Sequence, residues 1–135
     1  MSKSIFTRIM EGEIPSYPVY ENAFVYAFLD IHPASLGHVL VVPRTQVDAF
    51  DSLSEPFYSE IFRAAGLIAR AQKLAFHVPR VSLQIHGFEV PHAHIHLIPA
   101  HTMEDTAIKS GAPTPSTEEL KSTQNSIVIA ISSLA

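Results

Sequence analysis

The sequence has 135 residues, of which 47% are hydrophobic, and a formal net charge of −4 with the histidines neutral. A chain of this size and composition can bury a core, so we expect one domain over residues 1–135. The sequence contains no cysteine, which excludes disulfides, thiolate metal sites and cysteine nucleophiles.

The distribution of charged and apolar residues restricts partners and location. No stretch gathers more than two lysines or arginines, so we expect no nucleic-acid partner and favour a compact ligand. The longest apolar segments, 24–29 and 127–135, fall far short of the roughly 20 residues that span a bilayer, so we expect no membrane partner. The first residues lack the apolar core and cleavage site of a secretory signal, which favours a cytoplasmic location.

The N-terminal part of the chain predicts a short helix followed by a hairpin. In SIFTRIMEGE, Ser4 can cap a helix that Gly12 and Pro15 end. In PVYENAFVYAFLD, Val, Tyr and Phe dominate the flanks of Glu21 and Asn22, which predicts two strands joined by a tight turn at these two residues.

The middle of the chain predicts a central strand and the longest helix. HVLVVP, at 38–43, is almost continuously apolar, as expected of a central strand that is covered on both faces. The segment 54–76 repeats apolar residues with a helical period and begins close to a proline. RVSLQIH (80–86) and AHIHLIP (93–99) alternate with period two and predict two strands separated by GFEVP.

The segment 101–135 is expected to be a C-terminal appendage. SGAPTPST, at 110–117, has a linker composition. Ser116 and Glu119 have the spacing of a capping box and predict a helix, although the β-branched content of SIVIAIS is equally compatible with a strand. The order of all these elements predicts an α+β domain built on an antiparallel sheet.

Three histidines occupy every second position of VPHAHIHLIP. Alternate side chains of a strand lie on one face, so the imidazoles would share a surface while the apolar residues between them face the core. The histidines are His92, His94 and His96, and the apolar residues are Ala93, Ile95 and Leu97.

Two chemistries suit this arrangement. Zinc takes imidazole ligands at about 2.0–2.1 Å, but a rise of about 3.3 Å per residue separates the outer histidines by roughly 13 Å, so one ion would use at most two of them. Alternatively, His94 attacks phosphorus as a neutral nucleophile while its neighbours act as hydrogen donors. A third zinc ligand would have to come from His32, His38, His86, His101 or Glu89.

A purely structural role is the remaining interpretation. One partly buried, hydrogen-bonded histidine on a strand would not require any chemistry. Three of them on one face, directly preceded by a proline, favour a functional site.

The segment HAHIHLI resembles the signature of the histidine triad (HIT) superfamily of nucleotide hydrolases and transferases, His-x-His-x-His followed by two apolar residues. SIFTRIMEGEIPSYPVYEN and AFLDIHPASLGHVLVVP also stand in the family's order, so that the resemblance covers about residues 4–100. It implies an α+β, HIT-like fold with a five-stranded antiparallel sheet, one long helix and a short N-terminal helix, commonly paired in a homodimer.

The resemblance implies a mechanism that needs neither a cofactor nor a metal. His94 would attack the α-phosphate of a purine nucleotide to give a nucleotidyl-histidine that water hydrolyses, with His92 and His96 orienting the ring and binding the phosphate or the leaving group. The implied substrates are nucleoside phosphoramidates, acyl nucleotides or dinucleoside polyphosphates. A nucleotidyl transferase or phosphorylase, and a nucleotide-binding scaffold protein with little turnover, are the alternatives.

The resemblance also assigns a nucleotide pocket. Asp30 would accept hydrogen bonds from the ribose hydroxyls, as an ionised carboxylate is able to do. Val90 would pack near the sugar or phosphate, and Glu89 is placed among the nucleotide-binding residues as well. The base would be bound by Ile5, Phe6, Ile9, Phe28 and Ile31.

The sequence departs from the family pattern at two places. Many bacterial relatives hold a structural zinc with two cysteines and two histidines, and the corresponding positions here are Ser4, Thr7, Gln46 and His92, so we expect no structural zinc. Before the triad, Phe88 and Glu89 replace a glutamine and a serine or threonine, and the usual asparagine has no clear counterpart other than Gln84 or His86. The leaving-group side is therefore expected to differ from that of the family.

Overall fold

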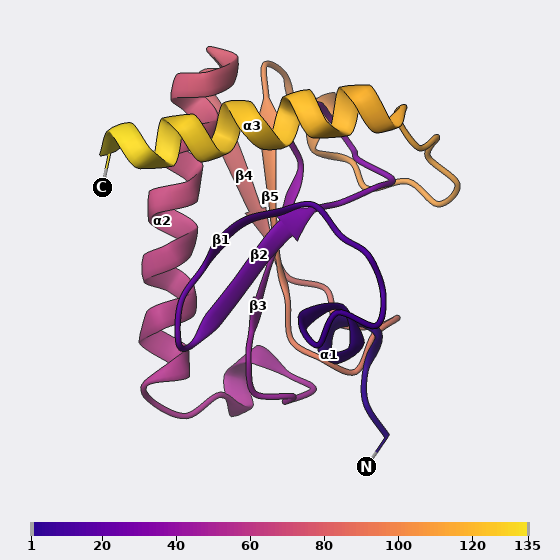
Figure 1. Cartoon of the computed structure of the whole chain (residues 1–135), viewed down its shortest axis with the longest axis vertical. Coiled ribbons are helices and arrows are strands. Elements are labelled where there is room, and N and C mark those ends of the chain that lie inside the picture. Colours follow the sequence, from indigo (N-terminus) through magenta and orange to yellow (C-terminus); the bar gives the residue numbers. More distant parts are fainter. Residues whose placement is uncertain (1, 135) are drawn as a thin grey trace.

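The order of the strands places the two most apolar ones inside the sheet (Figure 1). The protein is described here by a computed structural model covering residues 2–134. Its five strands form one antiparallel sheet in the order β1-β2-β3-β5-β4. The strands are β1 (Pro18–Glu21), β2 (Val25–Leu29), β3 (Val39–Pro43), β4 (Arg80–Gln84) and β5 (Ile95–Ala100).

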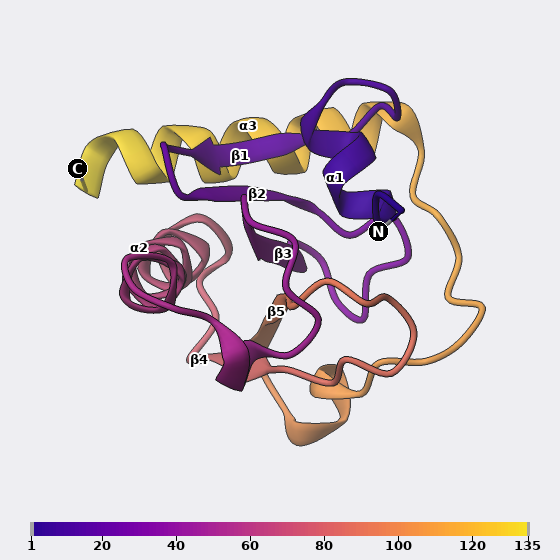
Figure 2. The ribbon, with the colours of Figure 1, turned by 90° about the horizontal axis from the view of Figure 1, so that it is seen from below.

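Helices cover both faces of this sheet. The three α-helices are α1 (Ile5–Met10), α2 (Phe57–Phe76) and α3 (Thr117–Leu134), and two short 3-10 helices span Phe50–Ser52 and Met103–Thr106. Figure 2 shows α2 and α1 on opposite sides of the strands. Every residue of β2 and β3 is buried, which confirms the prediction of a central strand over 38–43 that is covered on both faces. The predicted α+β class is also confirmed.

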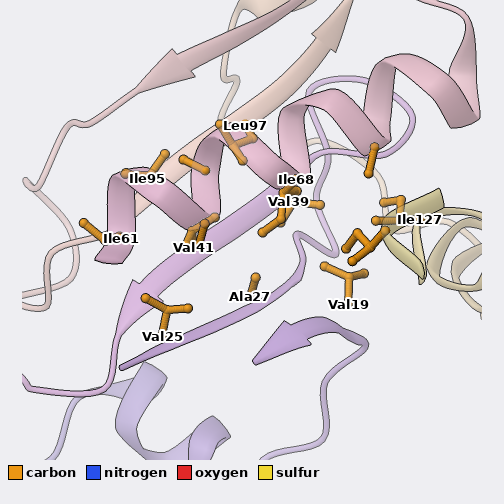
Figure 3. Packing of buried hydrophobic residues seen from close by; sticks show 14 of the residues in the cluster. Val19, Val25, Ala27, Val39, Val41, Ile61, Ile68, Ile95, Leu97 and Ile127 are labelled. Carbon is orange, nitrogen blue, oxygen red and sulfur yellow. The ribbon is translucent and has the colours of Figure 1, made fainter. Parts of the chain in front are cut away.

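The main core lies between the sheet and α2. Alternate residues of the strands, such as Val41 and Leu97, point toward Ile61 and Ile68 of α2 (Figure 3). Ile95 and Leu97 belong to this core together with Ala93, as the alternation in the histidine segment predicts. The histidines between them therefore face the opposite side, toward α1.

The C-terminal segment forms a helix that joins the same core. Ser116 Oγ accepts the N–H of Glu119 (3.1 Å), and the Glu119 carboxylate accepts the N–H of Ser116 (3.1 Å), so the capping box is present. Figure 1 shows α3 crossing α2, and Figure 2 shows it beside β1. Its buried face resolves the choice between helix and strand, because Leu120, Ile127, Ala130 and Ile131 recur at helical spacing.

Several observed boundaries differ from the predicted ones; β4, for example, ends at Gln84 and not at His86. The hairpin turn follows Glu21 and is closed by Asn22, whose Oδ1 accepts the N–H groups of Phe24 (2.8 Å) and Val25 (3.0 Å). Helix α2 begins at Phe57, three residues into the predicted range. Strand β5 begins at Ile95, because residues 90–92 form a tight turn and Ala93 N–H donates to Val47 O (2.7 Å) instead of to the sheet. Of the three histidines, only His96 lies within the strand.

Among residues 2–134, no helix has the length and apolar character that crossing a membrane would require.

A polar residue of α2 fixes the loop before β3. The side chain of Gln72 is fully buried, and its Nε2 donates to Gly37 O (2.8 Å) and Leu97 O (3.0 Å). Gly37 has a φ of +88°, and a Cβ atom added there would overlap the ring of Phe76. The backbone just before β3 is thus held tightly against α2.

The close approach at Gly37 predicts a large effect of a single methyl group. Gly37→Ala should lower the free energy of unfolding by about 2–5 kcal/mol, since it combines a left-handed backbone with overpacking. Gly12→Ala is the matched control, because Gly12 has a φ of +83° with open space around it, and only about 1–2 kcal/mol of backbone strain is expected. Urea denaturation measures both. Equal losses in the two variants would contradict the packing argument.

Candidate active site

The sheet register places His96 on the face that α1 covers. His96 lies opposite Leu40 of β3 and opposite Gln84 of β4, and Leu40 lies opposite Phe28 of β2. Because directly opposed residues share a face of the sheet, this row crosses it on the side away from α2. His92, His94 and His96 are all buried, with at most 8% of their surface exposed.

His92 is held between the N-terminus of α1 and the end of β3. Its Nε2 lies 2.9 Å from Pro43 O, which can only accept, so the ring hydrogen is on Nε2. Nδ1 then accepts from the Ser4 hydroxyl at 2.6 Å. Ser4 is also the N-cap of α1, accepting the N–H of Thr7 (3.0 Å). One serine thereby caps the helix and fixes the tautomer of His92.

His94 has one ring nitrogen committed and the other left with its lone pair. Nδ1 lies 2.8 Å from the carbonyl oxygen of His92 and must donate to it, so in the neutral ring Nε2 carries no hydrogen. The ring of Phe6 packs edge-on against that of His94, with 4.9 Å between centroids. This arrangement presents a fixed, neutral imidazole with the lone pair needed for nucleophilic attack.

His38 determines the orientation of the hydrogen on His96. Ala34 N–H donates to His38 Nδ1 (3.0 Å), so the hydrogen of this ring is on Nε2. That atom is 3.0 Å from His96 Nδ1, which therefore accepts and leaves the hydrogen of His96 on Nε2. His96 is consequently a hydrogen donor, while His94 is a potential nucleophile; their ring centroids are 5.0 Å apart.

Burial keeps these rings neutral. Desolvation is the main cause that lowers the pKa of each of the four histidines in the site, and for His96 the pKa falls to about 3, with His94, His38 and His86 adding repulsion. For His38 the nearby Asp30 partly opposes this shift. The neutral state is the one that the hydrogen-bond directions above require.

The arrangement around His38 also bears on metal binding. Among residues 2–134, Asp30, His38 and His96 place one ligand atom each within 4.8 Å of one another. A metal on His38 Nε2 would require the ring hydrogen on Nδ1, where it would face the N–H of Ala34. The hydrogen bonds therefore favour a pair of imidazoles, in which His38 donates to His96, over a metal centre at this place.

The four positions that correspond to a structural zinc in bacterial relatives do lie together. Gln46 Oε1 accepts from Ser4 N (2.7 Å) and from Thr7 Oγ1 (2.8 Å), and Ser4 contacts His92 as described. Hydroxyl and amide groups are not among the usual zinc ligands, which are thiolates, imidazoles and carboxylates. Hydrogen bonds link α1, the segment after β3 and the triad through these residues.

Three of the five predicted base-binding residues belong to a second apolar cluster. Phe6 and Phe28 are buried in it with Tyr26, Leu40 and Val42, and Ile9 and Val90 pack against it. Ile5 and Ile31 lie outside this cluster and expose 47% and 44% of their surface. Asp30 follows β2; its Oδ1 accepts the N–H of His32 (2.8 Å), and Oδ2 is 3.6 Å from His38 Nε2.

Glu89 lies outside this apolar cluster and lines a pocket. This pocket, of about 250 Å³, lies beside His94 and His96, and Val90 is the one residue it shares with the apolar cluster around Phe6. Its walls are His86, Gly87, Phe88, Glu89, Val90, His94, His96 and Ile108. Gln84 is not among these residues; its Nε2 donates to Thr106 O (2.7 Å), and its Oε1 lies 2.9 Å from His86 Nε2.

Sequence reasoning missed the roles of His38 and Ser4. The sequence indicates His38 only as one of several possible metal ligands, and Ser4 only as a helix cap and a replaced zinc position. Their partners, His96 and His92, are 58 and 88 residues away in the chain. No local pattern signals such contacts, although a histidine directly before the buried strand β3 (Val39–Pro43) is unusual.

Comparison with known proteins identifies the family. A family model described as the HIT domain matches residues 11–103. The chain is 34% identical over 115 residues to an adenosine 5′-monophosphoramidase of Saccharomyces cerevisiae, covering 84% of this chain and 72% of the relative. The crystal structure of a Hit-like protein from Bartonella henselae superposes with a TM-score of 0.84 at 29% identity, covering 95% and 96% of the two chains. The chain therefore belongs to the HIT, or histidine triad, family.

The lowered pKa values predict acid sensitivity of the fold. Unfolded histidine titrates near 6.5, so between that pH and the lower native pKa values the unfolded chain binds more protons. The free energy of unfolding should be highest above pH 6.5 and fall toward the pKa of His96, about 3. Each group contributes a slope of up to about 1.4 kcal/mol per pH unit.

The variant His96→Asn tests the predicted fall in the free energy of unfolding at acidic pH. The variant keeps an acceptor for His38 but removes one titrating group, so its free energy of unfolding should depend less steeply on pH between 7 and 4.5 (about one proton fewer). Urea denaturation across this range measures the slope. Parallel profiles for the variant and the wild type would show that His96 titrates normally in the folded protein.

Proposed function

We propose that this protein hydrolyses purine nucleoside phosphoramidates, or the related acyl nucleotides, through a nucleotidyl intermediate on His94. The observation that carries the proposal is the commitment of His94 Nδ1 to the carbonyl of His92, which leaves Nε2 as a neutral nucleophile beside the donor Nε2–H of His96. Relatives from three yeasts that bear the name adenosine 5′-monophosphoramidase support the substrate class.

The reaction follows in two displacements. His94 Nε2 forms a bond to the α-phosphorus as the bond from phosphorus to the leaving nitrogen breaks; that nitrogen keeps the electron pair, takes a proton from water and leaves as an amine. Water then attacks phosphorus, the bond to Nε2 breaks, and a proton returns to solvent. His96 donates to the phosphate or the leaving atom, and His92 holds the ring of His94. No step requires a metal or a cofactor.

The nucleoside is assigned to the side of α1. Phe6, Ile9, Phe28 and Val90 offer an apolar wall beside His94, and the half-exposed Ile5 and Ile31 would be covered by a bound base. Asp30 would accept from the ribose hydroxyls. A homodimer and the absence of nucleic-acid and membrane partners remain part of this proposal.

Substitution of the nucleophile tests the mechanism. With adenosine 5′-phosphoramidates, His94→Ala and His94→Asn should lower kcat by about a thousandfold or more while AMP still binds. Rapid quenching and mass spectrometry of the wild type should detect an adenylyl group on His94. Tight AMP binding without turnover in the wild type would instead favour a nucleotide-binding scaffold protein, and formation of ADP on addition of phosphate would favour a phosphorylase.

The role of Asp30 can be tested with the sugar. Asp30→Asn keeps an oxygen for the N–H of His32 but loses the charge, so kcat/KM for the ribose substrate should fall by about tenfold or more. The same variant should act like the wild type on a 2′,3′-dideoxy substrate. An equal loss of kcat/KM with both substrates would indicate that Asp30 acts through His38 and does not bind the ribose hydroxyls.

A further inference from the structure

The pocket beside His94 and His96 differs in chemistry from the apolar cluster around Phe6. Three of its residues, Phe88, Val90 and Ile108, are apolar, and among the described residues its walls contain one carboxylate, that of Glu89, and no lysine or arginine. A bound substrate that places its α-phosphate at the two histidines and its nucleoside against Phe6 has this pocket left for its leaving group.

The charge of the pocket is unfavourable for an anionic leaving group. Oligophosphates are usually bound by Arg or Lys, which supply charge-assisted hydrogen bonds. Here an oligophosphate would meet neutral, desolvated imidazoles and the carboxylate of Glu89, which would repel it. Dinucleoside polyphosphates therefore fit this side of the site poorly.

The same features favour a cation next to an apolar chain. Phe88 lines the pocket and exposes 94% of its total surface to solvent, so its ring is free to cover an alkyl chain or to stack under an ammonium group. Ile108, which is 41% exposed, adds a second apolar contact from the segment that leads to α3. Glu89 supplies the opposite charge.

We propose that this pocket selects amine leaving groups that carry a second, protonated amino group, and that Glu89 is the residue that determines this specificity. The inference rests on the proposed function and narrows its substrate class from phosphoramidates in general to those of diamines. Glu89, assigned from the family resemblance to the nucleotide, would thus contact the other half of the substrate.

Three adenosine 5′-phosphoramidates of equal chain length test the proposal. The leaving amines are 1,4-diaminobutane, butylamine and 4-aminobutyrate, which end in an ammonium, a methyl and a carboxylate group. In the wild type, kcat/KM should fall in that order, with about a threefold to tenfold step for each change of charge, as expected of a partly exposed ion pair.

Glu89→Gln should reduce the ratio of kcat/KM between the cationic and anionic substrates by about tenfold. Glu104→Gln is the matched control, because Glu104 is an exposed glutamate of the 3-10 helix Met103–Thr106 that does not line the pocket. Raising the salt from about 0.05 M to about 0.5 M should lower the wild-type ratio, since screening shortens the reach of the charge.

The outcomes separate the two proposals. Hydrolysis of all three substrates without an order by charge, or an unchanged ratio in Glu89→Gln, would overturn the specificity and leave the hydrolase intact. Failure of the folded wild type to hydrolyse any of them would overturn the proposed function itself.

Discussion

The site depends on hydrogen bonds that decide where each imidazole carries its single hydrogen. A neutral ring has one donor and one acceptor, so fixing one nitrogen fixes the other. The N–H of Ala34 fixes His38, and His38 in turn fixes His96; the carbonyl of His92 fixes His94. Burial lowers the pKa of these rings and so disfavours the protonated state, in which both nitrogens of a ring would be donors. Two adjacent histidines thereby obtain opposite roles.

Strand β3 is the element that positions both ends of the triad. Because β3 runs antiparallel to β5, the residue before it, His38, meets His96, whereas its last residue, Pro43, meets His92. Gln72 secures the same region from the other face by binding the carbonyls of Gly37 and Leu97. Packing against α2 therefore holds the backbone of β3 in place, and the two ends of β3 in turn position His96 and His92.

The two halves of the proposed substrate site are built differently. On the side of α1, Phe6 and Phe28 belong to a packed apolar cluster that extends to His94. On the other side, residues 86–89 are exposed, and Phe88 and Glu89 line the pocket beside His94 and His96. The first half is therefore a packed surface, whereas the second is an exposed loop.

The sequence by itself determined most of the fold and singled out the three histidines of the candidate site. Period-two patterns place Ile95 and Leu97 in the core, the helical period predicts α2, and the spacing of Ser116 and Glu119 predicts α3, because these signals depend on neighbouring residues alone. Tertiary structure decided the start of β5, the role of Ser4 and the pairing of His38 with His96. Each of these is set by contacts across tens of residues, and only the folded chain brings those atoms within hydrogen-bonding distance.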